Sequence, residues 1–179
     1  LAYSSGHETH PVTTVNWRDC MVWCNALTEW YNAQNGANYS CVYTSDSGYI
    51  TPIRDSRDGS FGSSVNTTAG SFDNPYVNPD AKGFRLLTSK EWELAARYRG
   101  TDTTNVVTGT IIGVDFSSMK IKWTKGNSAS GDTQAFDASI PTVGNYSVYS
   151  ENSGSSTAVV KSKTNGYNAL GLYDMSGNV

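Results

Sequence analysis

The residues that could perform chemistry through their type and spacing are few in this 179-residue sequence. Its two histidines, His7 and His10, stand three positions apart, a spacing at which an ordered turn can bring two imidazoles onto one metal ion. No carboxylate or thiolate pattern joins them, and short motif matches are often accidental. A solvated N-terminal segment is therefore the favoured interpretation of this pair.

The three cysteines, Cys20, Cys24 and Cys41, match neither a disulfide scaffold nor a zinc motif, and an odd number cannot pair completely within one chain. One alternative is a cysteine nucleophile served by a distant histidine. However, Cys20 and Cys24 lie on the apolar stripe of a predicted helix, where buried thiols usually act as small unreactive hydrophobic groups. We therefore expect structural cysteines.

The last nine residues, with the sequence GLYDMSGNV, carry the strongest metal signal. Asp174 stands beside a polar turn, so one carboxylate and two or three backbone carbonyls can converge on one point. Hard cations such as calcium prefer such an oxygen-only shell, although a plain tight turn is the simpler alternative. The sequence has no GxGxxG, P-loop, GxSxG or HExxH motif that would indicate another chemistry.

Two amphipathic helices are predicted to support these residues. The first runs from Asn16, which suits an N-cap, to about Gln34, before the stop signal of Asn35 and Gly36. Apolar residues recur in it at spacings of three and four, which predicts one buried stripe. The members of this stripe are Cys20, Trp23, Cys24, Leu27, Trp30 and Tyr31.

The second helix is predicted to begin at Thr88, where Glu91 completes a capping box, and to end near Arg99. Its expected inner face comprises Trp92, Ala95 and Ala96, with Glu93 and Arg97 as an exposed i,i+4 pair.

Short strands and long loops are expected around the helices. The strand candidates are residues 39–43, 84–86, 120–123, 157–160 and 170–173. Stretches 45–82 and 126–156 are rich in Ser, Gly, Asn, Asp and Thr, and loops of that length are often functional. With no internal repeat and no clear linker, the sequence predicts a single α+β domain over residues 1–179.

Composition and charge argue against two classes of partner. The 13 basic and 16 acidic residues give a formal net charge of −3 without a dense basic run, so nucleic acid is not an expected partner. No apolar run approaches the ~20 residues of a membrane helix, so no membrane partner is expected either. The compartment cannot be deduced from the cysteines.

Four sequence blocks together resemble the formylglycine-generating enzyme family, also called sulfatase-modifying factors. They are HPVTTVNWRDCMVWCNAL over residues 10–27, CVY over 41–43, GFRLLTSKEWELAAR over 83–97 and NALGLYDMSGNV over 168–179. The resemblance implies an α+β fold akin to C-type lectins, with two main helices, short antiparallel strands and long loops. Residues 45–82 and 101–156 would be variable insertions.

The resemblance also implies structural calcium. The side chain of Asp174 and the carbonyls of Gly177 and Val179 match one calcium site of the family. A second site begins with Asn127 and the carbonyl of Ser128, and Asp132 and Asp137 lie near it in the sequence. The next family ligand of the first site, a Glu, would follow Val179, so we expect little calcium binding by these 179 residues alone.

The activity implied by the family is copper- and oxygen-dependent oxidation of a client sulfatase cysteine to formylglycine. Its copper-binding cysteine pair belongs to a C-terminal third that would follow Val179, and Cys20, Cys24 and Cys41 do not occupy those positions. The start without Met and the end inside a family motif predict a fragment covering the N-terminal two-thirds, which would itself be inactive as an oxidase.

Two other functions are left open. A non-catalytic, C-type-lectin-like binding or display protein, such as a retroelement-diversified variable protein, would use the Ser- and Asn-rich insertions to hold a ligand. An iron-dependent sulfoxide synthase of the ergothioneine type would require a His-rich site, for which only His7 and His10 are present.

Overall fold

The computed structural model describes residues 9–57, 65–108, 110–111, 114–115, 122–124, 128–134 and 142–178. The chain divides into two compact units, one formed by residues 14–86 and the other by residues 1–13 and 87–179. Helix α1 (Trp17–Asn35) belongs to the first unit and helix α2 (Ser89–Arg97) to the second.

Helix α1 begins and ends where local chemistry predicts. The side chain of Asn16 accepts a hydrogen bond from the Asp19 amide at 3.0 Å, and the Asp19 carboxylate accepts one from the Asn16 amide at 2.9 Å. This capping box satisfies backbone donors that would otherwise lack partners in the first turn. At the other end, Gly36 adopts a left-handed φ of 63°, which a glycine tolerates without strain.

The buried face of α1 differs from the predicted stripe. Cys24 is buried as expected, but Trp23 and Trp30 are 60% and 59% exposed. The other fully buried positions are Met21 and two polar residues, Asn25 and Thr28. The prediction was wrong for the two tryptophans: the inner face of the helix carries Asn25 and Thr28 instead, whose side chains hydrogen-bond the backbone of neighbouring loops.

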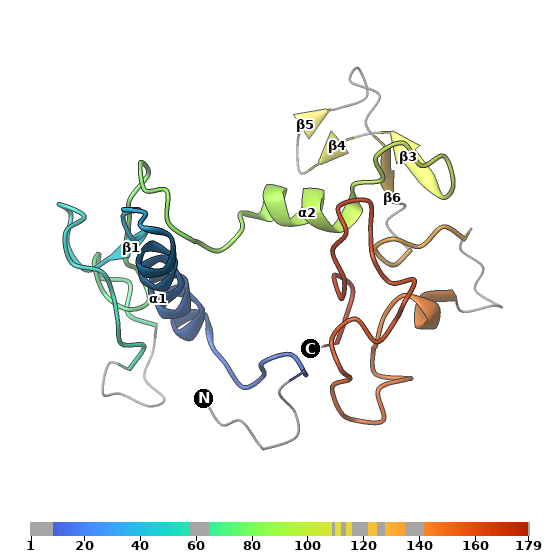
Figure 1. Ribbon diagram of the computed structural model, residues 1–179, viewed down its shortest axis with the longest axis horizontal. Helices are drawn as coiled ribbons and strands as arrows, with labels where there is room; N and C mark the ends of the chain where they lie inside the picture. The colour runs from blue at the N-terminus through green and yellow to red at the C-terminus, as the bar shows by residue number, and fades with distance from the viewer. Residues whose placement is uncertain are drawn as a thin grey trace. The chain divides into compact units, whose positions relative to one another are not determined.

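A two-stranded antiparallel sheet packs beside α1, formed by β1 (Tyr43–Thr44) and β2 (Tyr76–Val77) (Figure 1). The small core of this unit comprises Met21, Cys24, Val42 and Tyr43, with Ala81 and Leu86 packed against it. Asn25 donates its Nδ2 to the carbonyl oxygens of Tyr43 at 2.7 Å and Ile53 at 3.0 Å. The buried side-chain amide of Asn25 thus satisfies backbone carbonyls that would pair with another strand in a longer sheet.

Helix α2 carries the predicted capping box, since Thr88 Oγ1 accepts from the Glu91 amide and Glu91 Oε2 accepts from the Thr88 amide at 2.8 Å. The predicted Glu93–Arg97 ion pair forms, but its side chains are largely shielded from solvent and not exposed as expected. Of the expected inner face, Ala96 is buried, but Trp92 is 52% exposed, so that part of the prediction was wrong.

The second unit adds two more antiparallel pairs. Strand β3 (Val106–Thr108) pairs with β6 (Lys122–Thr124), and β4 (Thr110–Ile111) pairs with β5 (Val114–Asp115) (Figure 1). The ring of Trp123, 1% exposed, packs edge-on against that of Tyr98 at 6.3 Å between centroids. A short 3₁₀ helix, η2 (Thr142–Asn145), follows.

Two predicted strands coincide in part with real ones, at Tyr43 and at residues 122–123. The segments 84–86, 157–160 and 170–173 were predicted as strands but are not. Their backbone amides bond to side chains or to loops instead: the Leu86 amide donates to Tyr43 Oη, and the amides of Leu170 and Leu172 donate to Asn168 Oδ1. None of the helices in the described ranges is long and apolar enough to cross a membrane.

Candidate functional site

The C-terminal motif, residues 168–178, is organised by a buried asparagine. Asn168 Nδ2 donates to the Ala95 carbonyl oxygen at 2.5 Å and to Ser130 Oγ at 3.2 Å. Its Oδ1 accepts from the amides of Leu170 and Leu172. One side chain therefore joins the end of α2, the loop at residue 130 and the first turn of the motif, which places the residues that follow.

Asp174 lies in this motif on left-handed backbone, with φ at 57°. Its Oδ2 accepts a hydrogen bond from the Lys161 amide at 2.9 Å, and Lys161, itself at φ 62°, places its Nζ 5.5 Å from the centre of the Tyr173 ring. Residues other than glycine adopt this left-handed backbone conformation only where the surrounding structure enforces it. The carboxylate is thus fixed in place between two loops.

Gly177 and Asn178 lock the end of the motif. A Cβ atom at position 177 would lie 2.1 Å from the carbonyl oxygen of Val148, so the two backbones touch and only glycine fits. The Asn178 amide donates to the same Val148 oxygen at 2.8 Å, while its side chain accepts from the Ala158 amide and donates to the Ala158 carbonyl. The backbone at Gly177, one of the predicted ligand positions, is therefore packed tightly against Val148.

The second predicted calcium position lies beside a fully buried carboxylate. Asp132 is 1% exposed, and its oxygens accept from the Gln134 amide at 2.8 Å and from Thr142 Oγ1 at 3.0 Å. Among the described residues, the buried Ser128 hydroxyl has no hydrogen-bond partner, and neither has Oδ1 of Asn105, whose Nδ2 donates to the Asp132 carbonyl. Unpaired oxygens near a buried carboxylate indicate a place that could accept a hard cation.

Both positions offer oxygen donors, and that donor set fits calcium better than a soft metal. The Ser130 amide donates to Ser176 Oγ at 2.8 Å, so the loop containing Ser128 is joined to the C-terminal motif. Three other predicted site residues, Asn127, Asp137 and Val179, lie outside the described residues. No cluster of three or more His, Cys, Asp or Glu side chains suited to a metal occurs in the described ranges.

Two of the three thiols are buried, as expected for structural cysteines. Cys24 and Cys41 are buried, and burial is the main cause that raises the pKa of each thiol. Cys41 Sγ contacts the Asn25 carbonyl oxygen at 3.7 Å, while Cys20 is partly buried. Cu(I) prefers thiolate ligands, so the burial and raised pKa of Cys24 and Cys41 make these two thiols poor ligands for it.

The histidine pair is tested only in part. His10 Nδ1 lies 2.9 Å from Thr157 Oγ1, within hydrogen-bond distance, whereas His7 is outside the described residues. The N-terminal segment is also held by the Val160 amide, which donates to the Thr9 carbonyl at 2.8 Å. His10 thus contributes to the packing of a loop.

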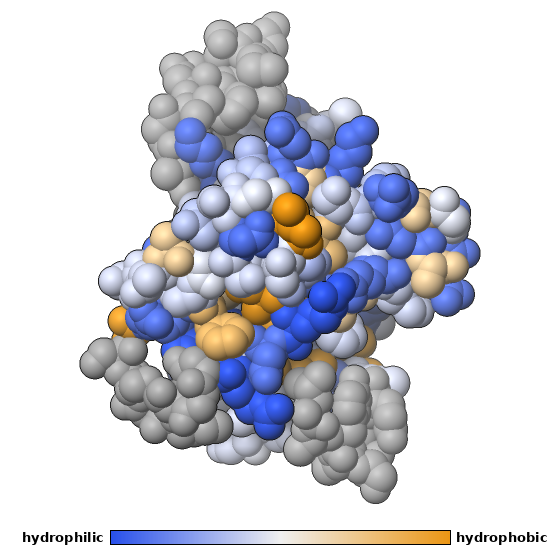
Figure 2. Space-filling view, turned by 90° about the vertical axis from the view of Figure 1, so that its left-hand side faces the viewer, coloured by the Kyte–Doolittle hydropathy of each residue, from blue (hydrophilic) through white to orange (hydrophobic). Residues whose placement is uncertain are grey.

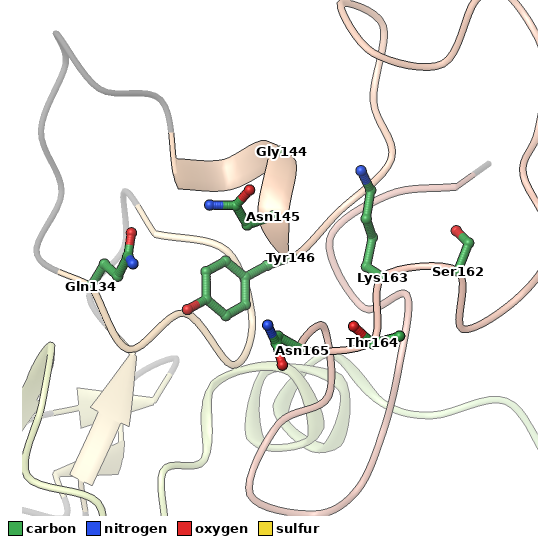
Figure 3. Close-up of a pocket in the computed structure, with 8 residues that line it drawn as sticks. All are labelled: Gln134, Gly144, Asn145, Tyr146, Ser162, Lys163, Thr164 and Asn165. Atoms are coloured by element: carbon green, nitrogen blue, oxygen red, sulfur yellow. The ribbon is translucent and has the colours of Figure 1, made fainter.

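A polar hollow of about 310 Å³ opens among the loops of the second unit (Figure 3). The residues that line it are Gln134, Gly144, Asn145, Tyr146, Ser162, Lys163, Thr164 and Asn165. Sequence analysis did not identify these residues as a site, because they come from three separate loops and share no spacing. Their polar composition was the only available signal.

Comparisons with known proteins agree with this architecture. Residues 2–179 match the model of the family described as Sulfatase-modifying factor enzyme 1-like domain. The chain is also similar to the solved structure of Treponema denticola variable protein 1, with 28% sequence identity and a TM-score of 0.58, over 100% of this chain and 51% of that one. The chain thus spans about half the length of that protein. No curated protein matches it.

These similarities confirm the predicted family and the α+β, C-type-lectin-like fold class. The predicted single domain over residues 1–179 and its insertions stay predictions.

Proposed function

We propose that this chain, which belongs to the Sulfatase-modifying factor enzyme 1-like domain family, is a ligand-binding module. The observation that carries the proposal is the similarity of its whole length to Treponema denticola variable protein 1. Binding residues lie disproportionately on loops that a rigid scaffold holds in position.

The internal architecture of both units supports this role. Buried amide side chains, Asn25 in the first unit and Asn168 and Asn178 in the second, hold the loops in place through backbone hydrogen bonds. The loop surface remains free to carry other side chains. On the face shown in Figure 2, hydrophilic residues dominate and hydrophobic residues form separate small patches, which suits recognition of a polar ligand.

Calcium is proposed to stiffen the C-terminal loops. The Asp174 side chain and the carbonyls of Gly177 and Val179 would hold one ion, and Asn127 with Ser128 would begin the shell of a second. The unpaired Ser128 hydroxyl and the rigid backbone at Gly177 support this assignment. A bound ion would lower the entropic cost of presenting the loops to a ligand.

The second candidate is the oxidase function, which the family match favours. Its partner would be a sulfatase, whose cysteine would be converted to formylglycine. The described thiols do not suit copper, since Cys24 and Cys41 are buried with raised pKa. No step of that reaction is therefore assigned to Cys20, Cys24 or Cys41.

An array of immobilised glycans and peptides, probed with the tagged chain, tests the proposal. Two variants serve as comparisons: one replaces the exposed Tyr49 and Ile50 by Ala, and the other replaces Ser162, Thr164 and Asn165 by Ala. We expect an array ligand whose binding is lost in one variant while the melting temperature stays unchanged.

The same preparation, incubated with a cysteine-containing sulfatase peptide, copper and oxygen, should leave the cysteine unchanged by mass spectrometry. Formation of an aldehyde would favour the oxidase function instead. Failure to bind any array ligand, or binding that both variants retain, would contradict the loop-presenting module.

A further inference from the structure

The polar hollow in Figure 3 is surrounded by unused hydrogen-bonding groups. Six polar side chains line it: Gln134, Asn145, Ser162, Lys163, Thr164 and Asn165. None of these side chains has a hydrogen bond or ion pair with another described residue. Their capacity to donate and accept hydrogen bonds is therefore available to a ligand.

The two asparagines are unusual for this protein. Most described asparagines use the side chain to bond the backbone of their own unit, as Asn25, Asn152 and Asn178 do. Among the described residues, the asparagine side chains without such a bond are those of Asn38, Asn145 and Asn165. Two of these three, Asn145 and Asn165, line the same hollow. The backbone-bonding role of the other asparagines does not explain their presence there.

The hollow is also shaped by fixed elements. Tyr146 is buried, and its hydroxyl lies 3.2 Å from Thr133 Oγ1, which holds the ring in place against the hollow. The backbone of Gly166 packs against Tyr146, because a Cβ at Gly166 would lie 2.6 Å from the Tyr146 carbonyl oxygen. The loop carrying Lys163 and Asn165 is thus held beside the loop carrying Asn145. The free side chains sit on a preformed frame.

The chemistry of the lining defines a ligand class. Carboxamides and hydroxyls both donate and accept, so they match the adjacent hydroxyls of a sugar ring. Among the described lining residues, Lys163 is the one charged side chain and none is acidic, so an anionic group is favoured beside it. The volume of about 310 Å³ lies at the lower end of the roughly 300–1,000 Å³ of small-molecule sites.

We propose that this hollow binds an acidic saccharide, a hydroxylated sugar ring that carries one carboxylate. The proposal rests on the ligand-binding function proposed above and names the ligand class of one loop site. Lys163 binds the carboxylate, while Asn145 and Asn165 bind ring hydroxyls. A phosphate ligand is less suited, because phosphate sites usually combine several cationic or backbone donors, and Lys163 is the one cationic side chain among the described lining residues.

Nuclear magnetic resonance of the ¹⁵N-labelled chain tests the proposal, since the NH₂ signals of asparagine side chains are observed directly. The chain is titrated with D-galacturonate and, as the neutral counterpart, with D-galactose. We expect the side-chain signals of Asn145 and Asn165 to shift with galacturonate at a Kd on the order of 1 mM. Galactose should bind about tenfold more weakly.

Variants make the test specific. Lys163→Gln should weaken galacturonate binding about tenfold and leave galactose binding unchanged, whereas the matched variant Lys161→Gln, two residues away and outside the lining, should bind both as the parent does. Asn165→Ala should weaken both sugars, and Asn38→Ala neither. Melting temperatures identify any variant that is unfolded, and the exposed Asn145 provides Asn145→Ala as a second probe.

Two results would overturn the inference. In the first, galacturonate shifts no NMR signal of a residue that lines the hollow. In the second, the Lys163→Gln variant still binds galacturonate more tightly than galactose. Array binding that persists in Lys163→Gln and Asn145→Ala variants would reject this site while the ligand-binding function stands. Absence of all array binding would instead reject the function itself.

Discussion

Arg18 and Asp73 form a two-point ion pair between residues 55 positions apart in the sequence. Arg18 Nε lies 2.5 Å from Asp73 Oδ1, and its Nη2 lies 2.7 Å from Oδ2. The same carboxylate also accepts the Asn66 amide at 2.8 Å. The first turn of α1 thus anchors the end of the long loop that precedes β2, and both side chains are largely shielded from solvent.

This pair predicts a pH-dependent stability. The hydrogen bond from Arg18, followed by that from the Asn66 amide, lowers the pKa of Asp73 in the folded chain. Its stabilising effect is therefore complete above the unfolded Asp value of about 3.9 and is lost as the pH falls from there through the folded pKa. We expect Asp73→Asn to lower the melting temperature at pH 7, with the difference from the parent vanishing in acid.

Thermal melts between pH 7 and pH 2 measure this effect. Asp80→Asn is the matched control, because the exposed side chain of Asp80 makes no bond to the described residues. A difference between parent and Asp73→Asn that stays constant with pH would contradict the role of the ion pair.

Asn25 should be one of the most sensitive positions of the first unit. It is 0% exposed, and its carboxamide bonds the backbone of Tyr43 and Ile53. Asn25→Ala leaves buried backbone groups without partners, so we expect a loss of about 2–4 kcal/mol in the free energy of unfolding. Urea denaturation measures it, with Asn38→Ala as an exposed control. Equal stability of the two variants would contradict this account.

Gly177 is predicted to be intolerant of any side chain. A Cβ there would meet a backbone oxygen at 2.1 Å, which cannot move without displacing Val148. Gly177→Ala should cost about 2–3 kcal/mol or prevent folding. Gly36→Ala provides the comparison, since a Cβ at position 36 would meet no neighbouring atom. Only the left-handed backbone conformation disfavours a side chain there, at a cost of about 1 kcal/mol. Denaturation of both variants measures these losses. A larger loss of unfolding free energy in Gly36→Ala than in Gly177→Ala would refute the prediction.

Thiol reactivity distinguishes structural from catalytic cysteines. Burial raises the pKa of Cys24 and Cys41, so few thiolates are present at neutral pH. We expect iodoacetamide to label Cys20 first in the native chain, and the other two only after unfolding in urea. Peptide mass spectrometry identifies the labelled residue, and Cys20→Ser should leave native labelling near zero. Rapid native labelling of Cys41 would show that this thiol is activated.

Calcium binding can be measured apart from any ligand. In a chain extended past Val179 to include the expected Glu ligand, calcium bound by Asp174 should raise the melting temperature, with a stabilisation of about 2.7 kcal/mol at a calcium concentration of ~100 times Kd. The 179 residues alone should show little or no rise. In the extended chain, Asp174→Asn should remove the rise. Glu151→Gln should retain it, because the exposed Glu151 bonds only Ser150 among the described residues. An identical rise in the parent and in Asp174→Asn would exclude this carboxylate as a ligand.

The helices were predictable because their ends depend on neighbours in the sequence. Asn16 with Asp19 and Thr88 with Glu91 form capping boxes three residues apart, and Gly36 ends α1 by its own conformational freedom. The family resemblance was likewise contained in contiguous blocks. These features need no knowledge of distant contacts.

The strands and the buried helix faces were harder to predict. Each β pair is two or three residues long, too short for an alternating pattern to be recognised, and several extended segments bond to side chains instead of to a strand. Trp23 and Trp30 were expected inside because a periodic pattern predicts a stripe but cannot tell which loops need hydrogen bonds from the helix.

The sequence by itself therefore determined the two helices, the family and the oxygen-rich C-terminal motif. Tertiary structure alone decided that Asn25 and Asn168 are buried, that Arg18 reaches Asp73, and that Asn145 and Asn165 line the same hollow. The physical reason is that a cap is a contact between residues three apart, whereas these groups meet only after the loops that carry them have been held in place by long-range hydrogen bonds.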